Sequence, residues 1–293
     1  MRTNAENLAV VSVVGEVWHP RQRGDSAWRV GADGIPRALP GTGGICYNVR
    51  VGMRALGWAG DHLEPGVTTR ARDDGENAAY NLLAMVGNTA RVVSGDAKGA
   101  AGYVTGKHGG VEHVLVEFSD EDLEKLLPGD RVLIRARGLG LELLDYPDVR
   151  VTNLDPDLLS VWQIREGEGV LYVPVTHVVP AKVMGSGLGR DNVFRGDYDI
   201  QTFSPDVVAE FGLDDLRIGD LVAIQDADNT FGRIYRAGAV SVGVVVHGGS
   251  FIAGHGPGVT TLFTSPQGRI EPVVDPQANL ADILGLRAEA ESA

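Results

Sequence analysis

Short, valine-rich apolar runs, each closed by Gly, Asp or Pro, are the feature that most restricts the fold of this chain. Apolar runs of about four to eight β-branched residues between turn-forming residues indicate strands, because amphipathic helices need longer periods. The clearest such runs cover residues 8–14, 90–94, 113–118, 131–136, 170–179, 221–226 and 239–246. Because frequent short strands are typical of β-barrels and β-sandwiches, the sequence predicts a mainly β fold with few short helices.

The expected helices are recognised by their ends. Four segments begin with a Ser or Asp cap, have an acidic or proline-containing first turn, or close on a glycine. They cover residues 73–87, 119–129, 155–162 and 204–212. In the first of them, Ala78, Leu82 and Met85 fall on one helical face, and Gly87 is expected to end the helix. A final helix over residues 279–290 is expected to dock on the outside of the molecule.

No low-complexity linker divides the chain, so we expect closely packed lobes. The best candidate for a boundary between two lobes is the turn-rich stretch at residues 146–157. We therefore predict an N-terminal β-rich lobe over residues 1–150 and a C-terminal β-rich lobe over residues 151–293, which ends in the terminal helix. Each lobe is expected to be a barrel or a sandwich.

One phrase occurs twice in the sequence. "AGDHLEPGVTT" covers residues 59–69, and "AGHGPGVTT" covers residues 253–261. The segments that lead into them, residues 44–60 and 238–254, have equal length, and each runs from a Gly through a valine-rich strand to Ala-Gly. Two similar lobes made by internal duplication would explain the repeat, although motifs this short also match by chance.

Each phrase joins a histidine to a rigid turn and a departing strand. Proline fixes one turn dihedral and glycine adopts conformations that other residues resist, so the chain turns sharply after the histidine. Such a histidine either belongs to a ligand site or forms a hydrogen bond at a structural corner. In a ligand site, the residues after each turn are expected to contact the substrate. They are Thr68, Thr69 and Arg70 in the first phrase and Thr260 and Thr261 in the second.

The first phrase carries the densest polar group of the chain. Carboxylate and imidazole groups together suit general acid–base catalysis or metal binding. The candidate catalytic residues are Asp61, His62, Glu64 and, from the second phrase, His255. The candidate ligands of a divalent metal such as Zn or Mn are His62, His108 and His255, with His113 and His247 as the remaining histidine candidates. Because no pair has a recognised metal spacing, a metal-free site is the alternative.

A site shared by both phrases makes one geometric demand. His62 and His255 then have to lie within a ligand's width of each other, on the order of ten ångströms. In the alternative, each corner closes its own barrel, and each histidine pairs with a backbone carbonyl. The second phrase has no counterpart of Glu64, which fits either a division of roles or sequence drift.

Two further residues are candidates for substrate contact. Cys46 follows the glycine-rich stretch "GTGGI", where it would be an activated thiol, although a lone cysteine between apolar residues is usually buried packing. Arg190 ends the segment "MGSGLGR" at residues 184–190, whose glycines suit a flexible loop or lid.

Charge and cysteine content limit the partners and the setting. A formal charge of −13 repels phosphate backbones and anionic membrane surfaces, so nucleic acid and membranes are unfavourable partners. No apolar run has the length of a membrane-spanning helix, and the first residues do not form a secretion signal. The single cysteine excludes an internal disulfide, which suits a reducing cytoplasm. Because exposed strand edges tend to be paired, we expect a homo-oligomer.

The stretch "ARVVSGDAKGAAGYV" at residues 90–104 indicates another kind of partner. It resembles the KOW motif of ribosomal proteins and transcription factors in the placement of its valines, its glycines and Lys98. The resemblance implies part of a small SH3-like barrel, which often contacts RNA in that family. Few basic residues surround the stretch in this acidic chain, which favours the barrel over RNA binding.

Longer segments resemble one family over nearly the whole chain. They are "RVGADGIPRALPGTGGICYNVRVG", "GWAGDHLEPGVTT", "KGAAGYVTGKHGGVEHVLVEF", "GLELLDYPDVRVTNLDPDLL" and "GHGPGVTTLFTSPQGRIEPVVD". The family is the bacterial and archaeal domain of unknown function 4438. The resemblance implies a compact, mostly β cytosolic protein without an assigned activity, and it carries over no catalytic residue. The glycine–turn–strand style also resembles that of acetamidase- and formamidase-type amide hydrolases.

These features lead to two hypotheses of different classes. In the first, the chain is an enzyme that hydrolyses an amide-like bond of a small polar metabolite. Water activated by a histidine or a metal attacks, and N–H groups of the glycine turns stabilise the oxyanion. In the second, the chain is a non-catalytic module that binds a small ligand, a protein or RNA through its KOW-like barrel.

Overall fold

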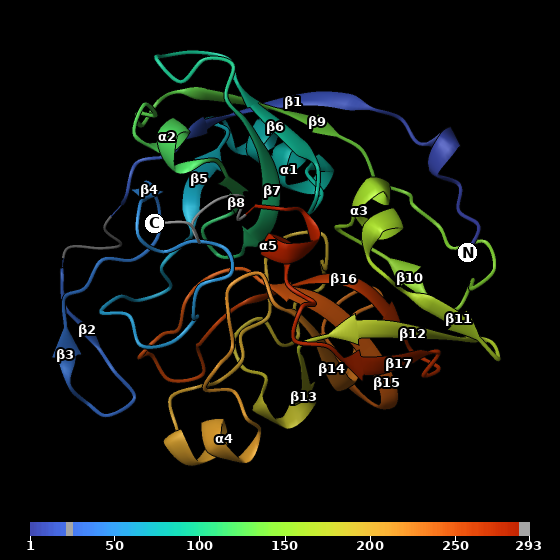
Figure 1. Ribbon diagram of the computed structural model, residues 1–293. Coiled ribbons are helices and arrows are strands. Elements are labelled where there is room, and N and C mark those ends of the chain that lie inside the picture. The colour runs from blue at the N-terminus through green and yellow to red at the C-terminus, as the bar shows by residue number, and fades with distance from the viewer. Residues whose placement is uncertain (22–25, 287–293) are drawn as a thin grey trace, which may run out of the picture.

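The computed structural model describes residues 1–21 and 26–286 and confirms the predicted fold class. Within these ranges strands dominate, and the longest of the five α-helices has 10 residues. The chain forms a barrel and, beside it, a group of open sheets (Figure 1). Two 3₁₀ helices, η1 (Ala5–Asn7) and η2 (Ala181–Val183), lie outside these sheets.

Six strands of the N-terminal half form a closed barrel. Their order is β1–β9–β6–β7–β8–β5, and pairing of β5 with β1 closes the circle, while β4 adds to the outer edge of β5. The strands are β1 (Val11–Val17), β4 (Ile45–Cys46), β5 (Gly66–Arg70), β6 (Thr89–Val92), β7 (Ala101–His108), β8 (His113–Glu117) and β9 (Arg131–Ala136). Valine side chains from most of them fill the interior, because a strand sends alternate residues to one face.

Helix α1 (Asp74–Leu83) packs against β1 and β8, with Asp73 as its cap. Its buried residues are Asn77, Tyr80 and Asn81. Of the three apolar residues predicted to share a face, Ala78 and Leu82 are half-buried, and Met85 is fully buried but lies beyond the end of the helix. The two asparagines stay buried because both side chains donate to the backbone carbonyl of Glu112, and the Tyr80 hydroxyl bonds to Thr69.

The other helices are a turn or two long: α2 (Asp120–Leu123), α3 (Pro156–Val161), α4 (Pro205–Glu210) and α5 (Leu280–Ile283). Side chains cap α2 and α3 as their sequences indicate, since Ser119 and Asp155 each accept a hydrogen bond from a first-turn N–H. Helix α1 ends earlier than predicted, because the chain leaves it at Ala84 and Gly87 belongs to the next turn, with a φ of 97°. Part of the predicted terminal helix, residues 287–290, lies outside the described residues.

An open five-stranded sheet, in the order β10–β16–β15–β14–β13, is the centre of the C-terminal half. Its strands are β10 (Arg150–Val151), β13 (His177–Pro180), β14 (Leu221–Asp228), β15 (Ile234–Val245) and β16 (Val259–Ser265). A three-stranded sheet consists of β11 (Arg165–Gly167), β12 (Val170–Val175) and β17 (Ile270–Val274) and lies next to it (Figure 1). Neighbouring strands are antiparallel except for the parallel pairs β13–β14 and β12–β17.

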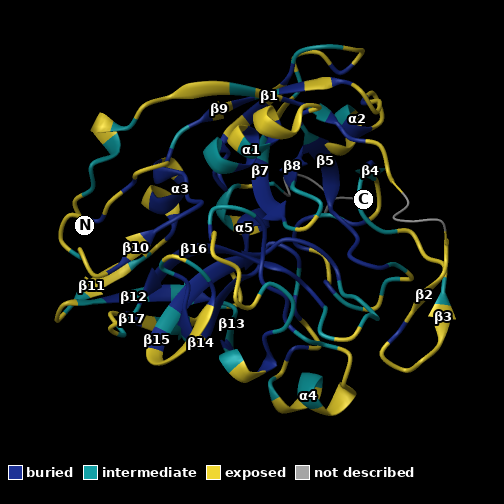
Figure 2. Cartoon of the chain, turned by 180° about the vertical axis from the view of Figure 1, so that it is seen from behind, coloured by how far each residue is buried: buried dark blue, intermediate teal, exposed yellow. Residues whose placement is uncertain are grey.

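Side chains cross between the two halves of the molecule. One apolar core fills the barrel, and a larger core lies among the C-terminal sheets. Val49, Val51 and Leu63 belong to the N-terminal half by sequence but pack into the C-terminal core. Gly106 of β7 lies so close to Val246 that a Cβ at this position would overlap the valine side chain. Buried chain therefore runs without a break from one half into the other (Figure 2).

The repeated sequence folds alike only around its turns. Residues 238–254 begin inside the long strand β15, whereas residues 44–60 contain only the two-residue strand β4. The predicted valine-rich strand in the first copy is therefore wrong. Gly52 and Gly57 turn this copy aside, with φ values of 89° and 90° in the left-handed region. Both Pro-Gly-Val-Thr-Thr phrases nevertheless lead into a buried strand, β5 in the barrel and β16 in the open sheet.

A small ribbon of β2 (Arg29–Val30) and β3 (Pro36–Arg37) stands at the edge of the molecule, at the lower left of Figure 1. It exposes Trp28, Val30 and Ile35, with exposed fractions of 63%, 63% and 53%. The chain on both sides of the ribbon runs along the mouth of the main cavity, and thus the ribbon belongs to the surroundings of the site.

Candidate metal centre

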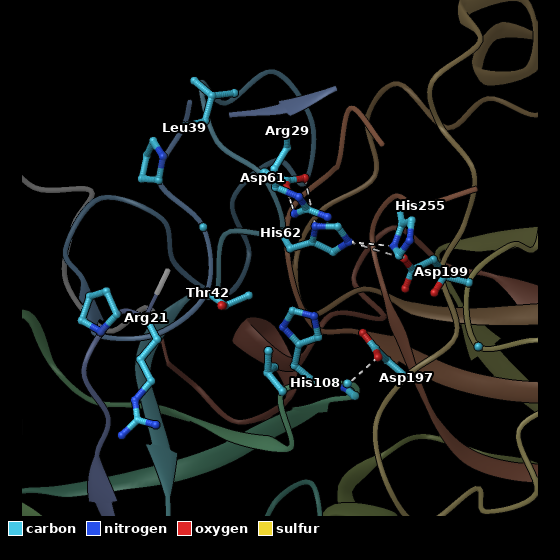
Figure 3. Close-up of a pocket in the computed structure, with 18 of the residues that line it drawn as sticks. Arg21, Arg29, Leu39, Thr42, Asp61, His62, His108, Asp197, Asp199 and His255 are labelled. Carbon is cyan, nitrogen blue, oxygen red and sulfur yellow. Dashed lines mark hydrogen bonds and ion pairs between the residues drawn. The ribbon is translucent and has the colours of Figure 1, made fainter. Parts of the chain in front are cut away.

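A cavity of about 910 Å³ lies where the two halves meet. Its walls come from the ribbon region, from the turn after β7, from residues 186–199 and from both histidine-containing phrases. His62, His108, Asp197, Asp199 and His255 point toward one another in this cavity (Figure 3). Segments distant in sequence thus bring imidazoles and carboxylates together.

The first cluster consists of His62, Asp199 and His255. Nε2 of His62 lies 3.0 Å from Nδ1 of His255, and this nitrogen of His255 lies 3.0 Å from Oδ2 of Asp199. Nε2 of His62 is 3.7 Å from the same carboxylate oxygen. The predicted proximity of His62 and His255 is therefore confirmed. Three ligand-type atoms from three segments converge on one point.

The second cluster consists of His108, Asp197 and His247, and all three residues are buried. The rings of His108 and His247 lie with their centroids 4.1 Å apart. Nε2 of His247 is 2.7 Å from Oδ2 of Asp197, yet among the described residues neither atom has a hydrogen-bond partner. Two buried polar atoms that approach without a hydrogen bond are expected where both face a common third partner.

The two clusters are neighbours, and Asp199 of the first lies beside the second. The His62 ring centroid lies 5.7 Å from that of His108 and 5.1 Å from that of His247. Asp199 directs Oδ2 to the first cluster, while its Oδ1 lies 4.0 Å from Nε2 of His247 in the second. In each cluster the ligand-type atoms lie within 4.8 Å of one another. The arrangement therefore offers two adjacent cation positions with Asp199 between them.

Three of the four histidines are held by the ring nitrogen that faces away from the cavity. Nδ1 of His62 pairs with Asp61 at 3.0 Å, and Nδ1 of His108 pairs with Glu64 at 2.6 Å. Nδ1 of His247 donates to the carbonyl of Gly248 at 2.8 Å. A carboxylate or carbonyl on one ring nitrogen fixes the tautomer that leaves the other nitrogen free to bind a metal. This pattern is typical of metal-binding histidines.

Backbone geometry explains how the carboxylates reach the cavity. Residues 197–199 are extended beside the start of β16, where Tyr198 and Val259 exchange two backbone hydrogen bonds. Alternation in extended chain places Asp197 and Asp199 on one side. Gly258 opposite them is essential for space, because a Cβ there would overlap Oδ2 of Asp197 and Nε2 of His247.

His62 has an unusual backbone. Its φ of 57° lies in the left-handed region, which is costly for a residue with a Cβ. The conformation is kept by the hydrogen bond from its N–H to the carbonyl of Gly249 and by the pairing of its ring with Asp61. Strain at this residue is therefore balanced by contacts that aim the imidazole into the cavity.

Opposite charges balance each other inside the second cluster. Burial alone would raise the pKa of Asp197, but the charges of His108 and His247 hold it below its ordinary value. Burial alone would lower the pKa of His247, but Asp197 and Asp199 raise it to about 9. Burial lowers the pKa of His108, and the charge of His247 adds to this effect. The carboxylates thus attract positive charge, which a proton or a cation supplies.

Glu64 and Asp61 each pair with a histidine of the clusters, and of the two only Asp61 lines the cavity. Glu64 is fully buried and accepts hydrogen bonds from Gly43, Thr68, His108 and His113, so it does not reach the cavity. Burial alone would raise its pKa, but the two histidines hold it well below its ordinary value. Asp61 accepts a hydrogen bond from Ser250 and pairs with Arg29. Both carboxylates are positioned to orient imidazoles, and their predicted role in catalysis stays a prediction.

The family of the chain follows from two adjoining matches. Residues 28–160 match the family model described as "Domain of unknown function (DUF4438), N-terminal", and residues 161–284 match the corresponding C-terminal model. The chain belongs to the DUF4438 family. The two DUF4438 models meet after residue 160, ten residues beyond the boundary predicted at residues 150–151.

A solved structure shows the same fold as this DUF4438 chain. The crystal structure of TM1086 has 50% sequence identity to it and a TM-score of 0.92, over 96% of this chain and 98% of that one. Comparison with curated proteins gives no match. In the described residues no helix is both long enough and apolar enough to cross a membrane.

Six of the seven residues predicted to contact the substrate lie away from the cavity. The hydroxyls of Thr68, Thr69, Thr260 and Thr261 are buried and hydrogen-bonded to Glu64, Tyr80, Lys107 and Asn229 respectively. Arg70 pairs with Asp74, and Cys46 is half-buried, where burial raises the pKa of its thiol. None of these six residues lines the cavity, since the strands direct them into the barrel, the open sheet or the outer surface. Arg190 does line it.

Sequence reasoning missed Asp197, Asp199 and Arg233. An Asp-x-Asp pattern indicates a shared face only where the chain is known to be extended, and the sequence predicts no strand over residues 197–199.

The KOW-like stretch at residues 90–104 forms most of the hairpin of β6 and β7. Two strands joined by a turn are the backbone arrangement that the resemblance implies. Both matching models are DUF4438 models, so the KOW resemblance itself stays a prediction.

Proposed function

We propose that this protein is a metal-dependent hydrolase that cleaves an amide-like bond in a small polar substrate. The observation that supports it is the pair of His/Asp/His clusters with Asp199 between them. Histidine nitrogens and carboxylate oxygens are the ligands that Zn and Mn sites use. Three protein ligands for each cation leave coordination positions for water and substrate.

The distances favour a pair of cations over a purely structural histidine network. Two-metal hydrolytic sites hold their ions about 3.5–4 Å apart. His62 and His247, one from each cluster, have ring centroids 5.1 Å apart, which is close enough for adjacent ions. A bound divalent cation would supply a nucleophile at neutral pH by lowering the pKa of water.

The residues of the chain have distinct tasks in this proposal. The four histidines, Asp197 and Asp199 hold the cations, and Asp61 and Glu64 orient two of the imidazoles. The N–H of Gly109 donates to Asp197 at 2.9 Å, so this glycine turn orients a ligand rather than an oxyanion. The cavity of about 910 Å³ accommodates a small molecule.

Elemental analysis and turnover together test the proposal. We expect the purified protein to hold about two divalent ions per chain, and to hydrolyse members of a panel of small amides only when they are present. Asp199→Asn should abolish both properties. His177→Gln is the matched control, because His177 pairs with Asp215 outside the cavity. Metal below stoichiometric amounts after addition of Zn or Mn would overturn the proposal. Metal without turnover of any amide would support a binding protein instead.

We further infer that the protein is a homo-oligomer. Its single cysteine supports a reducing cytoplasm as its setting, and its charge of −13 disfavours a nucleic-acid partner. The apolar side chains on the exposed β2–β3 ribbon support self-association, because burying them in a second copy removes them from water. Light scattering tests this directly. A mass of 31.1 kDa, that of a single chain, would overturn it.

A further inference from the structure

Arg233 is a buried cation at the cavity that lacks a full set of hydrogen-bond partners among the described residues. Its side chain lines the cavity although only 1% of the residue is exposed. In the described part of the chain its Nε has no hydrogen-bond partner, and one terminal nitrogen donates to the carbonyl of Arg195 at 3.5 Å. A guanidinium has five N–H donors, and a buried charge with unused donors is costly unless a ligand completes it.

A second arginine is fixed beside the first. The backbone N–H of Arg233 donates to the carbonyl of Arg190 at 2.9 Å, and the N–H of Gly189 donates to the carbonyl of Arg233 at 2.9 Å. Gly232 permits this approach, because a Cβ there would overlap the Arg190 carbonyl. Arg190 also lines the cavity and is exposed, and its side chain makes no hydrogen bond or ion pair to another described residue.

Two carboxylates of the clusters offset the charge of Arg233. Burial lowers its pKa, Asp197 and Asp199 act in the opposite direction, and the charge of Arg190 lowers it again. The two carboxylates that offset Arg233 are those assigned to the cations, which would take up their negative charge. Two neighbouring guanidinium groups then face the same cavity without a counter-ion of their own from the protein.

We propose that Arg190 and Arg233 form a subsite for an oxyanion group of the substrate, a carboxylate or a phosphate, beside the two His/Asp/His clusters. The planar fork of donors on arginine matches both kinds of oxyanion through paired hydrogen bonds. The substrate class is therefore an anionic amide, with its charged group on the arginines and its scissile bond at the clusters. Assigning the oxyanion to the substrate, and neutralising Asp197 and Asp199 with cations, both rest on the proposed function, whereas the donors that the two arginines leave unpaired among the described residues do not.

Calorimetric titration of the protein as purified tests this subsite, and the arginine variants distinguish an anion on the arginines from one on a metal. Inorganic phosphate and acetate are the two probes, and the tighter one identifies the oxyanion. We expect Arg233→Gln to weaken its binding by about tenfold or more, because charge-assisted hydrogen bonds are lost. Arg233→Lys should restore part of the affinity, since it keeps the charge without the fork.

Two further variants keep the test decisive. Arg190→Gln changes an exposed side chain, so it should fold normally and still weaken anion binding. Arg236→Gln is the matched control, because this arginine lies three residues along and pairs with Asp228. Absence of binding for both probes, or equal binding by wild type, Arg190→Gln and Arg233→Gln, would overturn the subsite. Arginine-dependent anion binding in a protein that takes up no metal would leave the subsite standing and reject the proposed hydrolase.

Discussion

At the first Pro-Gly-Val-Thr-Thr corner, Gly66 packs against Val116 and Glu117 of the barrel, whereas at the second corner Gly258 faces Asp197 and His247. Each glycine occupies a place where a Cβ would collide with its neighbours. Only at the second corner are these neighbours members of a cluster. The same turn chemistry therefore serves packing in one half and close approach to a polar site in the other.

The histidines of the two corners differ in a related way. His62 is held by Asp61 behind it and by its own left-handed backbone, and its side chain is 9% exposed. His255 pairs with Asp199 in front of it, and its side chain is 32% exposed. The first corner thus supplies a rigid ligand with carboxylate support, and the second a more accessible ligand. The comparison indicates that a repeated phrase sets the turn, while the opposing residues decide its role.

The largest effect is expected from alanine at the two glycines. Gly258→Ala should weaken metal binding by more than about 100-fold, because the new Cβ displaces two ligand atoms. Gly66→Ala should lower the free energy of unfolding by about 2–4 kcal/mol through its positive φ and overpacking, with unchanged metal content in the folded fraction. Metal analysis and chemical denaturation measure these effects. Equal metal loss in both variants would remove the distinction between the corners.

The next comparison removes the histidines themselves. His62→Ala and His255→Ala should each cost the protein one of two cations and most of its turnover, since both belong to the first cluster. The loss of affinity should be greater for His62→Ala, because that ring is more buried and better oriented. Metal titration followed by an amide hydrolysis assay measures both. Two ions bound with unchanged affinity in either variant would reject the assignment of that histidine.

Smaller effects are expected from the carboxylates behind the first corner. Glu64→Gln and Asp61→Asn should each weaken metal binding by about 10–100-fold while two ions still bind at saturation, because they orient imidazoles without ligating. Glu121→Gln, on the exposed helix α2, is the control. A lost binding site, rather than a weakened one, would mean that the carboxylate is itself a ligand.

The smallest effects should come from the buried threonines. Thr69→Val and Thr261→Val should each lower the free energy of unfolding by about 1–2 kcal/mol, because each leaves a buried partner without its hydrogen bond. Metal content and turnover should stay at wild-type level. Thermal denaturation and steady-state kinetics check this. A change in KM for either variant would restore the predicted role of these hydroxyls in substrate binding.

The local sequence predicts the features that depend on neighbouring residues, such as strands and helix starts. Short valine-rich runs gave the strands, and Ser119 and Asp155 gave helix starts, because strand formation and capping depend on a few neighbouring residues. The shared position of His62 and His255 in the repeat predicted their meeting. The role of Thr69 could not be predicted in this way, since its partner Tyr80 lies on a helix whose packing depends on Gly15 of another strand.

The site residues that the sequence did not predict depend on long-range contacts. Asp197 and Asp199 become ligands only because residues 197–199 run beside β16, and their sequence "DYD" resembles an ordinary surface turn. Arg233 becomes a buried cation because its backbone pairs with residues 189–190. Glu64 is a catalytic candidate in the sequence because a histidine and another carboxylate lie near it there. In the structure it accepts hydrogen bonds from four groups, which hold it outside the cavity.

The side chains that cross between the halves have a consequence for how the molecule comes apart. Val49, Val51 and Leu63 are matched by the N-terminal family model, yet they complete the core of the other half. Val246 in turn fills the space that Gly106 leaves open on the barrel. We therefore expect the whole chain to melt in a single cooperative transition, with the cavity lost in the same step. We expect that a fragment of either half does not fold alone, because it lacks side chains that complete its core.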